Sequence, residues 1–319
     1  MEDSREGARK GVQLIDIKED QVGQRLDNFL QRVLNGAPRS LIYRLIRKGQ
    51  IRVNKGRIKP GHKLKAGDLV RIPPLRLEVD DGPKVLPRGL LEEIRQSILF
   101  ENDHCVVVDK PSGLAVHGGS GLRFGLLDIV RAIRPEQDYL ELVHRLDRET
   151  SGCLLLAKNR QTLTFLHKQL KAGQVTKKYL AGLAGVWKAG KKTVSLRLKK
   201  NVIQGGERMV EVHPEGKMAV THFNPVQKFD DLSLMEVVLE TGRTHQIRVH
   251  ALSEGYPVAG DRKYGNPAYN QWIKSFGLNR LFLHAHWLEF QLPDVSERIQ
   301  INSPLPSGLK TVLNNLESE

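Results

Sequence analysis

The chain has 319 residues and a formal net charge of +14. No apolar run approaches the ~18 residues that a membrane-spanning helix needs, so we expect no membrane partner. The first residues lack the apolar segment of a signal peptide and are too acidic for a transit peptide, which predicts a soluble cytoplasmic protein. Cys105 and Cys153 show no metal-ligand spacing and lie in apolar runs, so we expect buried thiols in a reducing compartment.

The excess positive charge is concentrated in one short segment. Between Gln21 and Arg76 there are 14 Lys and Arg residues against 2 Asp and Glu, whereas the rest of the chain carries 36 against 34. Solubility alone does not require one-sided charge in one module, so the pattern indicates a surface that binds a polyanion. The length allows one large hydrophobic core beside such a module.

Within this segment the hydrophobic pattern predicts two helices and a small β-ribbon. Apolar residues at helical spacing predict a helix over 26–34, and Ser40 is placed to cap a second helix that ends at Gly49. We expect a strand at 51–53, a turn at 54–56 and two short strands within 64–72. Basic side chains gather around these elements, and we expect phosphate contacts from Arg25, Arg39, Arg44, Arg47, Lys48, Arg52, Lys55 and Arg57.

Three further regions complete the expected organisation. Residues 1–20 form an N-terminal tail before the module at 21–76, and the proline, glycine and acidic residues of 77–93 are typical of a linker. From 94 to 319 the patterns predict a hairpin within 98–108, a strand over 232–239 and another over 282–292. Helices are expected over 163–170 and 244–254. Strands in hairpins mixed with helices predict an α+β fold for this larger domain.

One nonapeptide carries the strongest chemical signal. The segment His144–Gly152 reads H-R-L-D-R-E-T-S-G and places Asp147 between two arginines. The apolar run at 153–157 is too short for a helix and predicts a buried strand. Asp147 would then lie in a loop fixed by a sheet, where arginine neighbours favour its ionised form and a nucleophilic role. A turn or capping residue is the alternative role for an Asp in this position.

The nonapeptide resembles the catalytic-loop signature of RluA-type RNA pseudouridine synthases. Three further segments resemble that family in the same order: K-P-S-G-L at 110–114 with V-H-G at 116–118, K-K-Y at 177–179, and T-G-R-T-H-Q-I-R-V-H at 241–250. The resemblance covers about residues 21–305. It implies an S4-type RNA-binding domain followed by a catalytic domain with a mixed, mainly antiparallel sheet and an active-site cleft across its middle.

The resemblance also implies a function and a set of site residues. The expected reaction converts specific uridines of large-subunit (23S) ribosomal RNA to pseudouridine, and we expect a monomer. Asp147 is the implied catalytic carboxylate, Arg243 its ion-pair partner, and Tyr179 the ring that packs on the target base. Arg145 is expected to fill the space of the flipped base. Side chains expected to shape the substrate cleft are His144, Ile247, Lys110 and His117.

Other roles stay open for several of these residues. Arg243 and Arg145 would also suit phosphate contacts, and Tyr179 and Ile247 would suit core positions. Addition of Asp147 to the base and attack at the ribose are both open. The cleft roles of Lys110 and His117 compete with core or surface roles.

No cofactor and no metal are expected. The reaction is redox-neutral, and the sequence has neither a G-x-G-x-x-G nor a P-loop motif. His245 and His250 are five residues apart, which does not suit a zinc pair on one helix face. Three alternatives compete: a non-catalytic rRNA-binding or ribosome-assembly factor, an S4-domain rRNA methyltransferase, and a glycosidase with Glu149 as second carboxylate. The methyltransferase would need a glycine-rich strand–turn–helix, which the sequence lacks.

Overall fold

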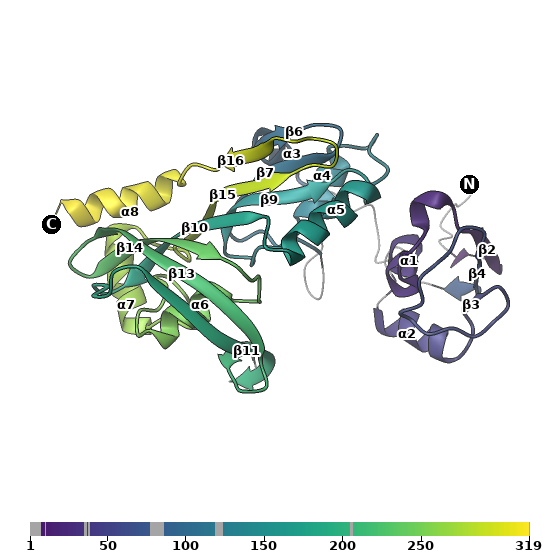
Figure 1. Ribbon diagram of the computed structural model, residues 1–319, viewed down its shortest axis with the longest axis horizontal. Coiled ribbons are helices and arrows are strands. Elements are labelled where there is room, and N and C mark those ends of the chain that lie inside the picture. The colour runs from purple at the N-terminus through teal and green to yellow at the C-terminus, as the bar shows by residue number, and fades with distance from the viewer. Residues whose placement is uncertain are drawn as a thin grey trace, which may run out of the picture. The chain divides into compact units, whose positions relative to one another are not determined.

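The computed structural model describes residues 8–9, 11–34, 37, 39–76, 86–118, 124–204 and 207–318, without the side chains of 8, 9, 20, 39, 76, 201–204, 207 and 208. The chain forms two compact units, Met1–Val85 and Leu86–Glu319, each with hydrophobic clusters of its own (Figure 1). No helix among the described residues is long and apolar enough to span a membrane.

The first unit packs two helices against a small antiparallel sheet. Strand β4 (Leu69–Ile72) lies between β2 (Gln13–Asp16) and β3 (Arg52–Val53). Helices α1 (Leu26–Val33) and α2 (Arg39–Arg47) bury their apolar faces in the same core as β4. Three shorter elements complete the unit: β1 (Ala8–Arg9), the 3₁₀ helix η1 (Glu19–Gln21) and β5 (Leu75–Arg76), which pairs with β1.

Most of the elements predicted here are confirmed, and two details are wrong. Helix α1 forms where the apolar spacing predicts it, and the turn after β3 contains Asn54 and Lys55, both with positive φ. Helix α2 begins at Arg39, so Ser40 lies in its first turn and is not the cap. Only β4 forms within 64–72, because the backbone of Leu64 bonds instead to Gly23 and Gln24, just before α1.

The second unit is built on an 11-stranded sheet. Its strands are β6 (Ile98–Glu101), β7 (Cys105–Lys110), β8 (Glu141–Leu142), β9 (Ser151–Ala157), β10 (Thr176–Ala184), β11 (Lys192–Gln204), β12 (Glu207–Val212), β13 (Lys217–Lys228), β14 (Leu232–Leu239), β15 (Leu283–Gln291) and β16 (Arg298–Asn302). The order is β12-β11-β13-β14-β10-β15-β9-β7-β6, with β16 beside β15 and β8 beside β9. Among the strands of the described residues, only the β15–β9 pair is parallel, which confirms a mixed, mainly antiparallel sheet.

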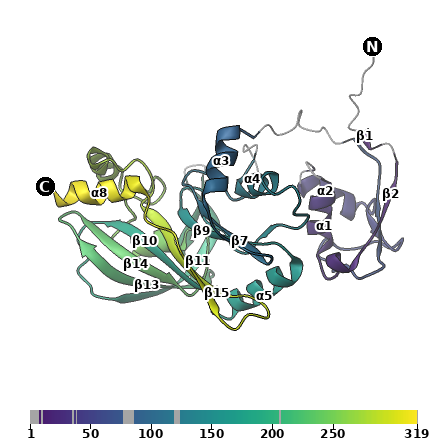
Figure 2. The ribbon, with the colours of Figure 1, turned by 90° about the horizontal axis from the view of Figure 1, so that it is seen from above.

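Helices cover both faces of this sheet. In Figure 2, α3 (Arg88–Gln96) and α4 (Leu126–Ala132) lie on one side of β7, and α5 (Arg160–Lys171) lies on the other. Alternate residues of β7 follow this division: Val106 and Val108 pack with α4, and Val107 packs with α5. The remaining helices are α6 (Gln246–Ser253), α7 (Pro267–Trp272), η2 (Ile273–Phe276) and α8 (Ser307–Glu317).

The strand that begins at the end of the nonapeptide, β9, is an interior strand between β15 and β7. Every residue of β9 is buried, as the apolar run predicts. The strand meets β15 in parallel at only two positions, Ser151 with His284 and Gly152 with Ala285. Gly152 has φ +109°, and a Cβ there would lie 2.3 Å from the carbonyl oxygen of Ala285, so this contact requires glycine.

Residues 77–85 of the predicted linker lie outside the described residues, and the rest of it is largely helical. Helix α3 lies largely inside the 77–93 range, and its Ile94 is fully buried against α4 and β7. Leu90, Leu91 and Ile94 lie on one face of α3 and pack in the core of the second unit, a helical spacing that the linker prediction did not take into account. The other elements expected in this domain form close to the predicted positions: the β6–β7 hairpin, α5, β14, α6 and β15.

Candidate active site

The loop that carries Asp147 is fastened to the end of β7. The backbone N–H of Gly113 donates to the carbonyl oxygen of Arg148 at 2.9 Å, and the Arg148 guanidinium returns a bond to Gly113 at the same distance. The hydroxyl of Ser112 donates to the carbonyl oxygen of Glu149 at 2.7 Å. Asp147 is thus held by backbone contacts on residues immediately after it, a rigid mounting for a functional side chain.

Lys110 adds three further hydrogen bonds to this attachment of the loop. Its side chain is fully buried, and its Nζ donates to the carbonyl oxygens of Pro111, Leu114 and Arg148 at 2.8, 2.8 and 3.0 Å. Burial, followed by the charge of Arg280, lowers the pKa of Lys110 to about 7. The expected role of Lys110 in the substrate cleft is therefore corrected: all three donors of its ammonium are used inside the protein.

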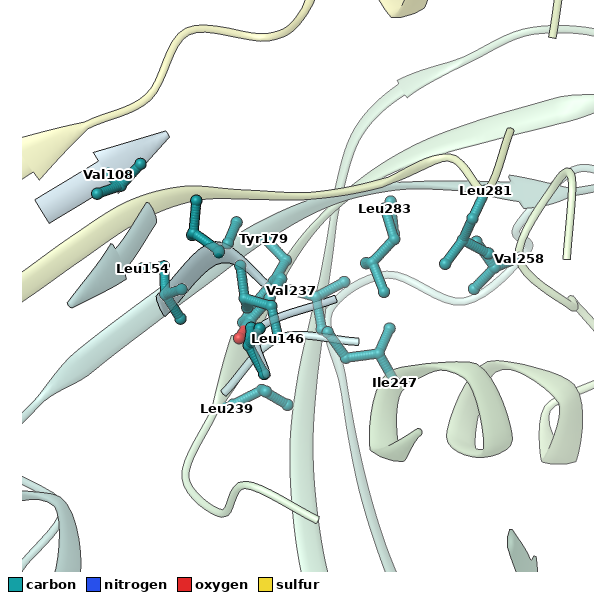
Figure 3. Close-up of a cluster of buried hydrophobic side chains, with 14 of the residues drawn as sticks. Val108, Leu146, Leu154, Tyr179, Val237, Leu239, Ile247, Val258, Leu281 and Leu283 are labelled. Atoms are coloured by element: carbon teal, nitrogen blue, oxygen red, sulfur yellow. The ribbon is translucent and has the colours of Figure 1, made fainter. Parts of the chain in front are cut away.

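A cleft opens beside Asp147, between the nonapeptide loop, the β10 and β15 strands and the start of α6. Figure 3 shows part of its apolar floor, where Leu146, Tyr179, Leu239, Ile247 and Leu283 converge from five separate segments. The lining residues are Arg145, Leu146, Asp147, Thr150, Tyr179, Leu239, Gly242, Arg243, Thr244, His245, Gln246, Ile247, Arg248 and Leu283. Because β10, β15 and β9 are adjacent, the cleft crosses the middle of the sheet.

The arginine that pairs with Asp147 is Arg248. Its Nη1 lies 3.5 Å from Oδ2 of Asp147. The same guanidinium is held on its other side by the buried Asp261, with Nε and Nη2 donating at 2.6 and 2.7 Å. Despite the cost of burial, these carboxylates keep the pKa of Arg248 above its ordinary value. Arg248 is therefore a fixed positive charge directed at Asp147.

Arg243 does not make the predicted ion pair. Its side chain is exposed at the mouth of the cleft, and its Nε donates to the carbonyl oxygen of Met218 at 3.1 Å. The physical reason is its place in the chain. Arg243 lies in the loop before α6, whereas Arg248 lies on a turn of the helix that packs into the unit. Arg145, also exposed, lines the same cleft.

Tyr179 lies in the apolar floor of the cleft. It is 7% exposed, and it packs in one cluster with Leu146, Val237 and Ile247 (Figure 3). Burial, with a smaller contribution from the negative charge of Asp147, raises the pKa of Tyr179 well above its ordinary value. A phenol in this state is neutral at physiological pH, so it offers a flat apolar surface and no base.

Three other predicted residues take different places. Ile247 lines the cleft from the first turn of α6 and is 4% exposed. His144 is not among the lining residues: its Nε2 accepts the backbone N–H of Leu155, and burial lowers its pKa to about 3. Its role in the structure is to join the loop to β9, which corrects the substrate contact expected of it. His117 is exposed in a loop and likewise does not line the cleft.

Several residues beside Asp147 were not predicted from the sequence. His245 places its Nε2 3.9 Å from Oδ2 of Asp147, and Tyr264 lies against both His245 and Arg248. Arg248 and His245 stand inside the T-G-R-T-H-Q-I-R-V-H segment, so the motif contained the signal without indicating which side chains turn inward. Asp261 and Tyr264 lie beyond all four motifs, and nothing in their spacing pointed to the site.

Comparison with known proteins decides what this site belongs to. Residues 104–253 match the RNA pseudouridylate synthase family and residues 24–70 match the S4 domain. Ribosomal large subunit pseudouridine synthase C of Haemophilus ducreyi is 48% identical over 97% of this chain and 97% of its own length. The protein of that name from Yersinia pestis is 49% identical over 95% of each chain.

The chain belongs to the RNA pseudouridine synthase family. Its membership confirms the resemblance seen in the sequence and makes it an isomerase. Among solved structures, human RNA Pseudouridylate Synthase Domain Containing 4 matches with a TM-score of 0.60 at 26% identity, covering 72% of this chain and 96% of that one. The family match includes Asp147, Tyr179 and Arg248, and ends before Asp261 and Tyr264.

The S4 match of this synthase includes all eight basic residues expected to contact RNA. Arg44, Arg47 and Lys48 are exposed and line a concave surface along α2 with Ser40 and Leu41. The other five basic residues differ in whether their side chains are bound within the protein. Arg25 is bound to Asp27 at 2.7 Å, Arg52 donates to the carbonyl oxygen of Gly49, and Lys55 and Arg57 are exposed, whereas the side chain of Arg39 lies outside the described residues.

We expect Lys110→Met to destabilise the synthase by about 3 kcal/mol, because three carbonyl oxygens around this buried side chain lose their shared donor. Urea denaturation of the full-length protein measures the change. Lys188→Met, at an exposed position, is the matched control and should change the unfolding free energy by less than ~0.5 kcal/mol. Equal effects of the two substitutions would show that Lys110 does not fasten the loop.

Arg248→Leu and Arg243→Leu should differ in the same measurement. Removing Arg248 leaves Asp261 buried without its partner, so we expect a loss of about 3–5 kcal/mol. Removing the exposed Arg243 should change the unfolding free energy by less than ~0.5 kcal/mol. A larger loss for Arg243→Leu than for Arg248→Leu would contradict the pairing described here.

Proposed function

We propose that this synthase converts specific uridines of large-subunit (23S) ribosomal RNA to pseudouridine, with Asp147 as the catalytic carboxylate. The observation that carries this proposal is the ion pair between Arg248 and Oδ2 of Asp147 at the edge of an apolar cleft. Among the described residues, Oδ1 of Asp147 has no hydrogen bond or ion pair, so this oxygen is the one available to substrate. The choice of large-subunit RNA as the proposed substrate rests on the names of relatives that are about half identical over nearly the whole chain.

The chemistry needs a carboxylate at the junction of sugar and base. The reaction breaks the bond between ribose C1′ and uracil N1, turns the base, and joins C1′ to C5. The proton that leaves C5 is balanced by one that N1 gains, so the product is an isomer of the substrate. It leaves the oxidation state of the substrate unchanged. Oδ1 of Asp147 supplies the nucleophile while Arg248 holds Oδ2 and so fixes the direction of attack. Both the ribose and the base are within the chemistry of such a carboxylate.

The other cleft residues bind and orient the base in this proposal. Tyr179 packs on the uracil ring. Burial keeps its phenol neutral, so the ring offers the base a flat apolar face. A uridine within folded RNA must leave its stack before it reaches Asp147, and the exposed guanidinium of Arg145 can occupy the vacated position. Arg243, exposed at the same mouth, is placed for a phosphate of the flipped nucleotide.

The S4 unit supplies affinity. Its exposed Arg44, Arg47 and Lys48 offer positive charges along one face of α2, which suits contacts to an RNA backbone. This division gives the chain one unit for binding and another for chemistry. The proposed enzyme acts as a monomer in the cytoplasm on ribosomal RNA or an assembly intermediate that contains it, and it needs no cofactor.

Asp147→Asn should abolish pseudouridine formation and spare RNA binding. The amide keeps nearly the same volume but removes the charge and the nucleophile. The measurement is tritium release from uracil C5 in a large-subunit RNA substrate, paired with filter binding. Asp138→Asn, the same change at an exposed position, should behave as wild type. Near-normal tritium release by Asp147→Asn would overturn the assigned mechanism.

The RNA named in the proposal has its own test in cells. Pseudouridines in 23S ribosomal RNA are mapped in a strain that lacks the protein and again after its return as wild type or Asp147→Asn. We expect a defined set of positions to be lost, restored by the wild type and absent with the variant. An unchanged map would contradict the proposed substrate.

Replacing Arg44, Arg47 and Lys48 together by Gln should reduce the salt dependence of RNA binding. Each phosphate contact contributes about 0.7–0.9 to the slope of log K against log salt, so losing three should reduce the slope by about 2–3. Binding is measured over a salt series with the same RNA. The control replaces Lys188, Lys191 and Lys274, exposed on the other unit, by Gln. An equal slope change in both triple variants would argue against the α2 surface.

A further inference from the structure

His245 occupies a strained backbone position immediately before α6. Its φ and ψ are 53° and 21°, the left-handed region that a residue with a side chain rarely adopts. This conformation directs the imidazole between two groups. Nδ1 lies 2.7 Å from the hydroxyl oxygen of Tyr264, and Nε2 lies 3.9 Å from Oδ2 of Asp147. The ring therefore spans the distance from Tyr264 to the carboxylate.

The surroundings of Tyr264 fix where its proton goes. The phenol is 8% exposed, and its oxygen accepts the backbone N–H of Val210 at 2.9 Å. Among the described residues, Nδ1 of His245 is the acceptor within reach of the hydroxyl proton. If Nδ1 carried a hydrogen instead, the buried phenol would face two donors and its own proton would have no partner.

The surroundings of Nε2 of His245 favour the same tautomer independently. An unprotonated Nε2 would direct its lone pair at an oxygen of Asp147 that is already negative. A hydrogen on Nε2 replaces this repulsion by attraction. Both ends of the ring thus favour the neutral form with hydrogen on Nε2 and none on Nδ1.

We propose that His245 is a positioning residue of the synthase, a neutral imidazole whose Nε2–H faces Oδ2 of Asp147 in a tautomer that Tyr264 fixes. The role rests on the proposed catalytic function of Asp147. His245 and Arg248, three residues apart at the start of α6, then hold the same carboxylate oxygen from two directions. This arrangement leaves Oδ1 directed to substrate.

The charged and titratable groups around the ring keep it neutral at physiological pH. Burial lowers the pKa of His245 most; Asp147 and Asp261 raise it, and Arg248 and Lys263 lower it further. Tyr264 adds to this effect by occupying Nδ1, the site where a second proton would bind. Since the pKa in the folded protein lies below the ordinary value, the neutral form persists through neutral pH and is lost only as the pH falls through that lower value.

The tautomer can be observed directly in the full-length protein. Nitrogen-15 labelling of histidine with two-dimensional NMR at neutral pH distinguishes protonated from unprotonated ring nitrogens, and His245→Gln assigns the signals by removing them. We expect Nε2 of His245 to be protonated and Nδ1 unprotonated. The opposite tautomer, or an imidazolium at neutral pH, would overturn the proposal. This readout does not depend on activity, so it stands apart from any failure of Asp147→Asn to block the reaction.

Single-turnover rates test whether the reaction needs the N–H group of His245. Gln can present a neutral N–H near the position of Nε2, whereas Leu has similar size and no donor. We expect His245→Gln to stay within about threefold of wild type and His245→Leu to fall by about 10- to 100-fold, because Leu removes the N–H that faces the carboxylate oxygen at 3.9 Å. Equal rates for the two variants would show that the donor is unnecessary.

Tyr264→Phe tests the control of the tautomer by a pH profile. The substitution keeps the ring that lies 4.9 Å from the Arg248 guanidinium and removes the hydroxyl. With Nδ1 free to bind a proton, the pKa of His245 should rise, and the acid limb of the single-turnover profile should move toward neutral pH. Tyr256→Phe, a half-buried tyrosine beside Trp187, is the control and should leave the limb in place. An unmoved limb in Tyr264→Phe would contradict the assigned hydrogen bond.

Discussion

The site depends on one buried guanidinium shared by two carboxylates. Asp261 holds Arg248 by two short bonds, and it also accepts the backbone N–H groups of Lys263 and Tyr264. These four donors satisfy the buried carboxylate, and the arginine it orients is left with one nitrogen directed at Asp147. The difference between the two carboxylates sets their roles. Asp261 has bonds to both of its oxygens and serves structure, whereas Asp147 keeps Oδ1 free of bonds to the described residues, for the role proposed above.

The fold brings these groups together from distant parts of the sequence. Asp147 comes from the loop before β9, Tyr179 from β10, and Arg248 from α6, which packs on β11, β12 and β13. Each is anchored to a regular element or, for Asp147, to a loop bound to the end of β7 through Lys110. Because the anchors are rigid, the side chains need little rearrangement before they act. The strained backbone at His245 is tolerated for the same reason, since the packed start of α6 determines it.

Local patterns predicted the elements well and the site less well. The apolar spacing of α1, the buried run of β9 and the strand at β14 depend on neighbours in sequence, so they could be read directly. The sequence left Lys110 open between a cleft role and a core role, because its three acceptors come from residues 111, 114 and 148 and meet only in the folded chain. Arg243 and Arg248 stand five residues apart in one motif. Choosing between them required knowing where α6 begins and which side of it is buried.

The parallel contact between β9 and β15 has a consequence for how activity relates to folding. It comprises two residue pairs, and it joins the strands that present Asp147 to those that present Tyr179 and Leu283. Before these two pairs form, Asp147 lies on one part of the sheet, and the cleft residues Tyr179 and Leu283 lie on the other. The proposed reaction therefore needs this pairing. Under the proposed mechanism, turnover thus reports that this long-range pairing is complete, and Gly152, which permits the pairing, is a folding requirement placed inside the motif that carries Asp147.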